Sequence, residues 1–502
     1  MRALLAVALG SLFLGCHSNG SGDVRADAGD VTGHTDGGTI AAGTSVLEHH
    51  GGPSRAGVYP QSGVAGGALH LDPAFHASVD GFIYAQPLFL DQGGLDLVIA
   101  VTAQNKVYAL DAKSGAAVWS RTLGAPVALA QLLCGNIDPL GITGTPIVDA
   151  ASRTIYLDAM TTPDGGATKK HLIFALSVDD GSTRPGWPVD VSATARAGSM
   201  AFDSAVHNQR GALLLLGGVL YVPYSGHYGD CGDYRGWLVG ISTSRPTQVT
   251  AWATTGLGGG VWAPSGVASD GTSLYVATGN TIGVPSWVGG EAIIRLAPGP
   301  VFSGQSADYF APSSWPSLDG TDLDLGGSGV ALIDMPGAST PKLVAALGKD
   351  GNVYLVGRNN LGGIGTALYN ARVSSDQIIT ASVVYTTGQG TYLAFRGAGV
   401  GCPAGQTGDL VALQITPPSA RVAWCASAGG GGSPMVTQSG GATVVWGLGA
   451  QGDGRLHAYA GDSGATLGDS DAMGGIRNFQ APIAAKGRVF VGGDGAVYAL
   501  AP

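Results

Sequence analysis

The stretch DLVIAVTAQNKVYALDAKSG (96–115) decides the fold, because it joins an alternating apolar run, a turn and a second apolar run that ends in a loop. The same pattern returns along the chain at intervals of about 50 to 65 residues. Its eight copies span residues 96–115, 153–181, 218–242, 273–299, 342–360, 391–415, 443–464 and 488–501. A supersecondary unit that repeats at this period is the signature of a radial or stacked array.

Each copy is preceded by one more apolar run of strand length. These lead strands lie at residues 85–90, 144–150, 211–217, 263–269, 327–333, 379–385, 433–439 and 481–487. Several units also end in a fourth strand that carries an aromatic residue, as at Trp119, Trp252 and Trp424. Four short antiparallel strands joined by Gly, Asn, Asp and Ser turns make one propeller blade. The sequence therefore predicts an all-β, eight-bladed β-propeller of four-stranded antiparallel blades.

The last unit is incomplete, because the chain stops at Pro502, just after the third strand of that unit. Residues 67–80, which precede the first lead strand, have the length and alternation of a strand. An N-terminal strand that completes the last blade would remove an exposed sheet edge and hold both ends of the ring together. We therefore expect residues 67–80 to pair with residues 497–501 as the outer strand of the eighth blade.

Composition supports this fold and excludes some partners. The 85 glycines suit many tight turns, and only 12% of the residues are charged. With a net charge of −10 and no cluster of Lys and Arg, the chain is not expected to bind nucleic acid or a membrane surface through basic residues.

The N-terminus has the pattern of an export signal. Residues 1–16 hold an apolar stretch that ends in LFLGC (12–16), which resembles a bacterial lipobox, although Phe13 and Leu14 depart from the usual residues. This predicts a lipoprotein-type signal peptide with lipidation at Cys16, and ordinary signal-peptide cleavage is the alternative. The expected location is the outer membrane or cell surface, with a periplasmic or secreted protein as the alternative, and the membrane is contacted only through the lipid anchor.

Three further regions follow the signal. Residues 17–45, rich in Gly, Ala, Asp, Ser and Thr, are expected to form a disordered tether. Residues 46–66, with His49, His50 and Arg55, are expected to pack on the propeller, which spans 67–502.

The cysteines other than Cys16 number four, and export permits disulfides. All four fall in loops predicted to share one face of the ring. Cys402 and Cys425 bracket one hairpin of a single blade, so we pair them, and Cys134 then pairs with Cys231 across neighbouring blades; free buried thiols are the alternative.

The repeats also resemble a known family. YALDAKSGAAVW (108–119) is similar to the repeat of pyrroloquinoline-quinone (PQQ)-type propellers, in which a turn is followed by a Trp that docks on an adjacent blade. HNQRGALLLLGGVLYV (207–222), GGGVWAPSGVASDGTSLYVATGN (258–280) and GKDGNVYLVGRNNLGG (348–363) resemble bacterial quinoprotein-dehydrogenase-like propellers. The resemblance spans nearly all residues after the tether and implies the fold, whereas one propeller shape serves enzymes, scaffolds and binding proteins.

The resemblance does not extend to the quinone site. In that family the cofactor lies between an adjacent Cys-Cys disulfide and a stacking Trp, beside a Ca²⁺ held by carboxylate and amide groups and an Asp that acts as base. This chain has no adjacent cysteine pair and no evident matching set of Glu, Asn and Asp on three blades. No cofactor is therefore expected, and PQQ and Ca²⁺ remain alternatives without their signature.

Candidate ligand-binding residues cluster where the lead strands begin. His207, Asn208, Gln209 and Arg210 precede the third lead strand, Trp262 precedes the fourth, and Asp324 the fifth. We expect a ligand to enter the central funnel and to contact Arg210, since concave sites with a few convergent polar groups bind small molecules. The alternative is that Asn208 and Arg210 bond carbonyl groups between blades.

A metal site is a further hypothesis. The side chains of Asp319, Asp322 and Asp324 offer the oxygen ligands that Ca²⁺ prefers, although such residues more often cap strands and turns.

Two classes of function stay open. The first is a monomeric, non-catalytic, surface-anchored propeller that binds an envelope protein, a glycan or a small ligand through its long-loop face. The second is a quinoprotein-type oxidoreductase or another enzyme with its site in the funnel, although the sequence indicates no catalytic residues.

Overall fold

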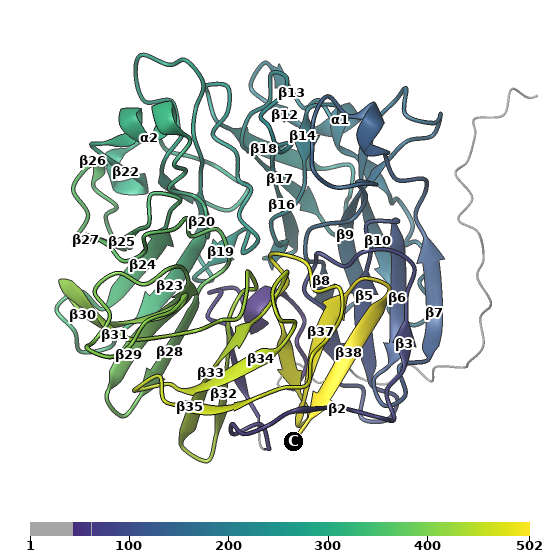
Figure 1. Cartoon of the computed structure of the whole chain (residues 1–502). Helices are drawn as coiled ribbons and strands as arrows, with labels where there is room; N and C mark the ends of the chain where they lie inside the picture. Colours follow the sequence, from purple (N-terminus) through teal and green to yellow (C-terminus); the bar gives the residue numbers. More distant parts are fainter. Residues whose placement is uncertain (1–43, 62) are drawn as a thin grey trace, which may run out of the picture.

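The computed structural model describes residues 44–502 with the exception of residue 62, and these residues form a ring of eight β-sheets around a central channel (Figure 1). The signal peptide predicted at 1–16, Cys16 and most of the tether predicted at 17–45 lie outside the described residues.

The first four blades follow the chain. Blade 1 is β4–β7 (Leu88–Leu90, Leu97–Val101, Lys106–Asp111, Ala117–Thr122), and blade 2 is β8–β11 (Ile147–Asp149, Thr154–Thr161, Lys170–Ser177, Val189–Asp190). Blade 3 is β15–β18 (Leu214–Leu216, Val219–Gly226, Trp237–Ser242, Val249–Ala253) with β14 (His207–Asn208), and blade 4 is β19–β22 (Ala268–Ser269, Leu274–Ala277, Ile293–Leu296, Tyr309–Pro312) with β26 (Gly363–Gly365).

The other four blades complete the ring in chain order. They are β23, β24, β25 and β27 (Val330–Asp334, Lys342–Leu347, Asn352–Gly357, Tyr369–Arg372), β28–β31 (Val383–Thr387, Gly390–Arg396, Leu410–Thr416, Ser419–Ala426), β32–β35 (Met435–Ser439, Ala442–Leu448, Leu456–Ala460, Thr466–Asp469) with β1 (Val58–Pro60), and β36–β38 (Ile483–Ala485, Arg488–Gly493, Ala496–Ala501) with β2 (His70–Leu71) and β3 (Ala77–Ser78). The predicted all-β, eight-bladed propeller is therefore confirmed.

The eighth blade closes the ring as predicted. β2 pairs antiparallel with the end of β38, with His70 opposite Ala501, and β3 pairs with its beginning, with Ala77 opposite Val497. Between them the chain leaves the sheet, and Asp72 forms an ion pair with Arg488 at 3.1 Å. The outer strand thus comes from the N-terminal side and the three inner strands from the C-terminus, so that both ends of the ring are held in one sheet.

The recurring tryptophans dock on the next blade. The indole nitrogen of Trp119 donates to Val178 O at 2.8 Å, and that of Trp424 donates to Gly461 O at 2.8 Å. Each ring covers a turn glycine, because a Cβ on Gly181 would lie 2.7 Å from Trp119 and one on Gly464 would lie 2.8 Å from Trp424. Contacts this short leave no room for a side chain, so these two positions require glycine.

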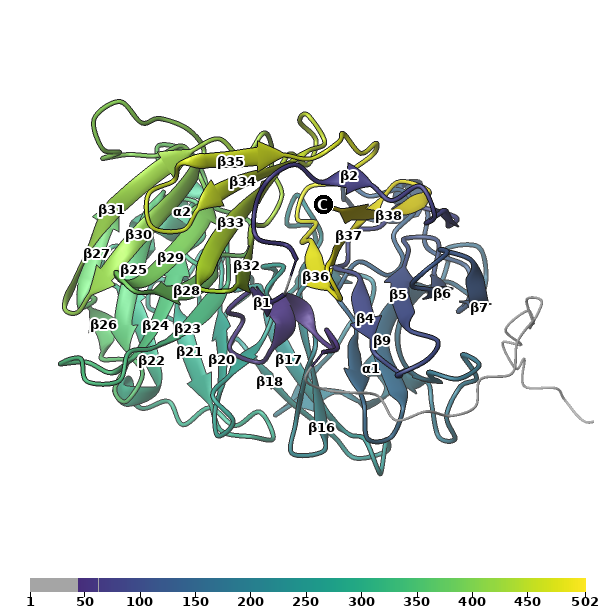
Figure 2. The same cartoon turned by 90° about the horizontal axis from the view of Figure 1, so that it is seen from below.

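Segment 44–61 lies in the central channel. Backbone groups of its residues bond the first strand of blades 1, 2, 4, 5, 6 and 7, through Val46, Leu47, Pro53, Ser54, Ala56 and Gly57. Side chains of Arg55 and Gln61 reach blades 3 and 8. The purple ribbon lies among the first strands of the blades in Figures 1 and 2. The segment therefore satisfies the inner strand edges that the blades leave unpaired.

Arg55 fixes this segment to the ring. Its guanidinium is 1% exposed and donates to Val267 O at 2.9 Å, Leu213 O at 2.9 Å and the carboxylate of Glu48 at 2.9 Å. Burial raises the pKa of Glu48 and lowers that of Arg55, and their mutual attraction opposes both shifts. One buried cation thus joins blades 3 and 4 to the segment in the channel.

The helices of the described residues are short, and all of them except η1 (His49–Gly51), which precedes the first strand, lie in connections between strands. They are η1, η2 (Leu129–Gln131), α1 (Val191–Thr194), η3 (Ser306–Asp308) and α2 (Trp315–Thr321), and a small hairpin is formed by β12 (Arg196–Ala197) and β13 (Met200–Ala201). Across residues 44–502, residue 62 aside, none of the helices has the length and apolar character needed to span a bilayer.

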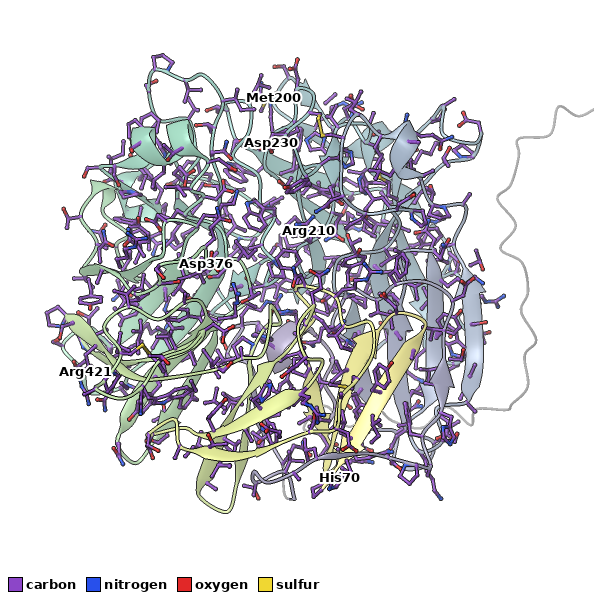
Figure 3. All side chains as sticks on the ribbon, viewed as in Figure 1. His70, Met200, Arg210, Asp230, Asp376 and Arg421 are labelled. Carbon is purple, nitrogen blue, oxygen red and sulfur yellow. A yellow bond between two sulfur atoms is a disulfide. The ribbon has the colours of Figure 1, made fainter. Side chains whose placement is uncertain are left out.

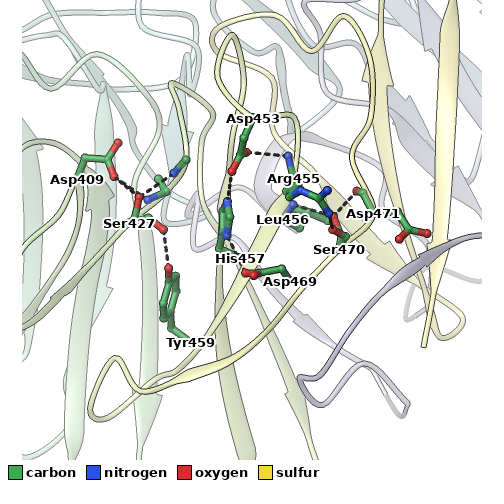
Figure 4. Close-up of polar contacts among 12 residues, drawn as sticks. Asp409, Ser427, Asp453, Arg455, Leu456, His457, Tyr459, Asp469, Ser470 and Asp471 are labelled. Atoms are coloured by element: carbon green, nitrogen blue, oxygen red, sulfur yellow. Dashed lines mark hydrogen bonds and ion pairs between the residues drawn. The ribbon is translucent and has the colours of Figure 1, made fainter.

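Polar contacts hold the outer part of blade 7 together (Figure 4). The two ring nitrogens of His457 lie 2.9 Å from an oxygen of Asp453 and 2.8 Å from an oxygen of Asp469. Arg455 donates to Ser470 O at 2.5 Å. Because Asp453 follows the second strand of the blade and Asp469 ends the fourth, this cluster serves to tie a loop to the blade edge.

Buried histidines make stability sensitive to acid. Burial lowers the pKa of His50, His207 and His227 to about 4, and it lowers that of His49 well below 6.5. A histidine with a lowered folded-state pKa takes up a proton more readily when unfolded, so its contribution is complete above pH 6.5 and is lost as the pH falls toward 4. The neighbouring Asp158 raises the pKa of His171 despite burial, and this group alone among the five opposes the trend.

We therefore expect the free energy of unfolding to fall by at least about 3 kcal/mol between pH 7.5 and pH 5, although the raised pKa of the buried Glu291 carboxyl opposes part of the loss. Urea unfolding followed by tryptophan fluorescence at several pH values measures this change in wild type and in Glu291→Gln, which removes the opposing carboxyl. A free energy that stays level over this interval in both proteins would show that these imidazoles reach water in the folded state.

Candidate functional site

The ring encloses a cavity of about 590 Å³, here called the funnel cavity. It opens on the face that bears the loops leading to each first strand and the loops following each second strand. Segment 44–61 fills the channel behind it. A ligand can therefore approach this cavity from one face of the ring.

Equivalent positions of the repeat build the cavity wall. The residues before the first strands include Asn208, Arg210, Trp262, Asp324 and Phe479, and those after the second strands include Asp230, Asn280 and Lys349. Figure 3 places Arg210 near the centre of the ring. The propeller thus gathers side chains that are far apart in the sequence around a single axis.

The structure separates the four residues of the predicted cluster into two pairs. Asn208 and Arg210 line the funnel cavity, whereas His207 and Gln209 are buried and do not. His207 stacks on Phe202 at 4.4 Å and accepts from the backbone N–H of Arg235 at 3.2 Å. Gln209 donates to the carbonyl of Gly211. Alternate residues of extended chain face opposite sides, so the expectation of ligand contact is corrected for His207 and Gln209.

Arg210 is a cation without an anionic partner among the described residues. No hydrogen bond or ion pair joins it to another residue of 44–61 or 63–502, and its guanidinium carbon lies 5.2 Å from the ring centre of Phe479. This arrangement differs from the alternative in which Arg210 bonds carbonyls between blades. Burial lowers the pKa of Arg210, which signals an incompletely compensated charge.

Neighbouring cations are paired. Lys349 lies 2.8 Å from Asp322 and 2.5 Å from Asp324, and Arg477 donates two hydrogen bonds of 2.7 Å to Asp494. Arg210 is therefore the cation of this wall best able to attract a ligand anion.

Phe479 and Trp262 provide the aromatic surfaces. Phe479 has a φ of 72°, a left-handed conformation that is unusual for a bulky residue and is found mostly where packing or function enforces it. Trp262 is partly exposed in the wall, and the ammonium of Lys349 lies 5.4 Å from the centre of its ring.

The three carboxylates proposed as metal ligands each have protein partners. Asp319 accepts two hydrogen bonds from Thr281, at 2.8 and 2.6 Å, and Lys349 lies against both Asp322 and Asp324. No group of three or more His, Cys, Asp and Glu suited to a metal occurs within the part of the chain that the structure describes. The structure thus does not bring Asp319, Asp322 and Asp324 together as a ligand set, and the ammonium group occupies the place between two of them.

Glu291 lies behind this wall and is fully buried. One oxygen accepts from Leu325 N at 2.6 Å, and the other has no partner among the described residues. Burial, reinforced by the charge of Asp324, raises the pKa of Glu291 well above its usual value. The neutral form of this carboxyl group is therefore more favoured than in an exposed glutamate.

Disulfides fix the loops of this face. Cys134, in the connection between blades 1 and 2, is bonded to Cys231 in the loop after β16, and Cys402 is bonded to Cys425 within blade 6. The first bridge joins the connection that carries Asn136 to the loop that carries Asp230, and both residues line the funnel cavity. It therefore holds the cavity mouth in shape.

Sequence reasoning missed Asn280, Lys349 and Phe479 as wall residues. Position in the repeat is a signal for two of them, because Asn280 and Lys349 lie two or three positions after the second strand of their blades. Asp230 also follows the second strand of its blade, in a longer loop. Aligning the eight repeats on their second strands would have indicated this set.

Comparison with known proteins gives the fold and leaves the role open. No protein-family model matches the sequence, and no curated protein matches it significantly. The quinohemoprotein alcohol dehydrogenase from Comamonas testosteroni superposes with a TM-score of 0.62 at 16% identity, covering 92% of this chain and 81% of that one. The quinohemoprotein alcohol dehydrogenase ADHIIG from Pseudomonas putida HK5 gives 0.62 at 15% identity, covering 91% and 80%. A europium-containing methanol dehydrogenase gives 0.58 at 14% identity, covering 90% of each chain.

The chain thus shares its eight-bladed propeller fold with these quinoprotein alcohol and methanol dehydrogenases. At these identities the likeness concerns the fold alone.

Proposed function

We propose that this protein is a binding module that captures a small, anionic, ring-bearing molecule in the funnel cavity. The observation that carries the proposal is Arg210, a partly buried cation with no anionic partner among the described residues. A charge-assisted hydrogen bond to a ligand carboxylate is stronger than a neutral one, and more so where water is largely excluded.

Other wall residues suit the body of such a ligand. The partly exposed ring of Trp262 offers a stacking surface, which sugars and planar rings can cover. The side-chain amides of Asn208, Asn280 and Asn478 also line the cavity, and none is hydrogen-bonded within residues 44–502 apart from residue 62. A few polar groups on an otherwise shaped surface fix the orientation of a bound ligand.

Binding without catalysis is the favoured role, as the sequence suggested. The carboxylate of Asp324 faces the cavity but is held by Lys349 at 2.5 Å and by the backbone N–H of Asn280 at 2.6 Å. Both carboxylate oxygens therefore already have protein partners, which leaves neither oxygen free to take a proton from a substrate.

A quinone cofactor is the second candidate, and the wall fits it in part. PQQ is a planar polycarboxylate, which Trp262 would stack against and Arg210 and Lys349 would neutralise. When bound it would supply two-electron oxidation of an alcohol. The set Asp230, Asn280 and Asp324 comes from successive blades, yet the ammonium of Lys349 already pairs with Asp324, so the wall does not fit the calcium ion.

Titrations with three probes separate these possibilities. D-glucuronate, neutral D-glucose and PQQ are added to the protein with and without Ca²⁺, and binding is followed by calorimetry and tryptophan fluorescence. We expect glucuronate to bind at least about 10-fold more tightly than glucose, because the two differ at the carboxylate. Glucose binding as tightly as glucuronate, or no binding of any anion, would refute the proposal.

The quinone alternative has its own readout. Submicromolar binding of PQQ together with alcohol-dependent reduction of a redox dye would establish an oxidoreductase in place of a binding module. PQQ that binds no more tightly than glucuronate, with no dye reduction, would support the binding role.

The proposed setting is the outer envelope. Lipidation at Cys16 and the tether after it would hold the ring near a membrane, while the first described residues, Thr44 and Ser45, bond Asp91 on the ring. This location is inferred from the N-terminal sequence pattern, and metabolic labelling with a radioactive fatty acid in wild type and Cys16→Ser tests it.

A further inference from the structure

A second cavity of about 150 Å³ lies beside the funnel cavity, and we call it the deep cavity. The two share Asn136, Arg210, Asn478 and Phe479 in their walls. His49 of segment 44–61 lines the deep cavity and not the funnel cavity. The deep cavity therefore lies between Arg210 and the segment that closes the channel.

Charge distinguishes the two cavities. The funnel cavity is lined by the carboxylates of Asp230, Asp322 and Asp324, whereas none of the twelve residues lining the deep cavity is acidic. Its wall contains Arg210 and Arg477, and the charge of Arg477 is balanced by Asp494. A negative group would therefore be more stable on the deep side of Arg210 than among the acids above it.

The floor contains a polar group without a partner. His49 is 1% exposed, and its Nδ1 has no hydrogen bond within the described part of the chain. Its ring stacks on His50 with 4.3 Å between centroids, which fixes its orientation. An unsatisfied buried nitrogen is costly, so one at the floor of a polar cavity points to water or a ligand as its partner.

Tyr84 adds a free hydroxyl to the wall. No hydrogen bond of this hydroxyl to the described residues is found, and the guanidinium of Arg477 lies 6.0 Å from the ring centre. Burial raises the pKa of Tyr84, so the group keeps its proton and can donate it to an acceptor. Arg210 and Tyr84 are thus two donors facing a cavity without acids.

The deep cavity is large enough for a carboxylate with its attached carbon atoms. A cavity of about this volume can also hold a benzene-sized group, so size alone does not assign the parts of a ligand to the two cavities. The absence of acids beside Arg210 places the carboxylate in the deep cavity, and the partly exposed ring of Trp262 places the ring of the ligand in the funnel cavity.

We infer that the deep cavity is the carboxylate subsite of the proposed ligand, with Arg210 between the subsite and the ring-binding part of the funnel. This inference rests on the proposed function and adds that the ligand enters with its carboxylate leading and its uncharged body against Trp262. The recognised class is a ring compound whose carboxylate projects from the ring, as in a uronic acid.

Small probes test the subsite apart from the funnel. Acetate and its neutral analogue acetamide are added to the full-length protein, and binding is measured by saturation-transfer NMR. We expect acetate to bind with millimolar affinity and acetamide to give no saturable signal. Arg210→Gln should abolish acetate binding, and Tyr84→Phe should weaken it about 2- to 10-fold through loss of one hydrogen bond.

Variants of the two cavities provide the controls. Trp262→Phe changes the funnel cavity alone and should leave acetate binding unchanged while it weakens glucuronate binding. His49→Gln should weaken acetate binding. If this substitution of a buried residue prevents folding, Tyr84→Phe tests the deep cavity in its place.

The outcomes separate the subsite from the proposed function. Two results would overturn the subsite alone. In the first, glucuronate binds through Arg210 while acetate does not bind. In the second, the affinity for acetate changes in Trp262→Phe and does not change in Tyr84→Phe. Acetate that binds as expected while glucuronate does not would uphold the subsite and overturn the ring-bearing ligand.

Discussion

Replacing Arg210 by glutamine is expected to weaken glucuronate binding by about 10- to 150-fold, the equivalent of about 1.5 to 3 kcal/mol for a hydrogen bond to a charged group. The physical reason is that Arg210 lines both cavities and has no ion pair or hydrogen bond with the described residues. Its charge is therefore free to bond the ligand carboxylate, and glutamine cannot supply that charge. Calorimetric titration of wild type and variant measures the change.

The same substitution should leave folding nearly unchanged. Arg210 contacts Phe479 through its guanidinium but ties no blades together, so the melting temperature should stay within a few degrees of wild type. Arg396→Gln is the matched control, because Arg396 lines a neighbouring cavity and is paired with Asp376 at 3.1 Å. An Arg210 variant that unfolds, or an Arg396 variant with the larger loss of binding, would show that Arg210 acts as a structural residue.

Replacing Arg55 by methionine is expected to lower the free energy of unfolding by about 3 to 5 kcal/mol, the usual cost of removing one partner of a buried ion pair. The change leaves the half-buried Glu48 carboxylate without its partner and removes the donors to Val267 O and Leu213 O. Denaturant unfolding at pH 7.5 measures it.

The double variant Arg55→Met with Glu48→Gln should recover part of this loss, since it no longer leaves an unpaired charge. A loss below about 1 kcal/mol in the single variant would contradict the role of segment 44–61 as a tightly bound filling of the channel.

The blades could be predicted because each repeat carries its own alternation and turns. Even the closure by residues 67–80 follows from counting strands, since one blade lacked its fourth strand and one spare strand was present. Segment 44–61 gave no such signal. HHGGPSRAGVY (49–59) has no period and contains groups that usually prefer water, yet it is buried because the inner strand edges offer unpaired backbone groups around the channel.

The candidate site was predictable in part. Arg210, Trp262 and Asp324 precede first strands, and the propeller brings such positions to the axis. The sequence could not predict that the side chains of His207 and Gln209 point away from the funnel cavity, because the stretch around them has no alternation of apolar and polar residues. The missing partner of Arg210 and the pairing of Lys349 depend on loops whose course only the folded ring defines.

The most direct measurement is a crystal structure of the protein grown with D-glucuronate. Density for the sugar in the funnel, with its carboxylate bonded to Arg210 on the side of His49 and Tyr84 and its ring against Trp262, is the predicted result. Either of two results would contradict it. The funnel contains no sugar and Arg210 is paired with a protein carboxylate, or the sugar is bound outside the ring of blades.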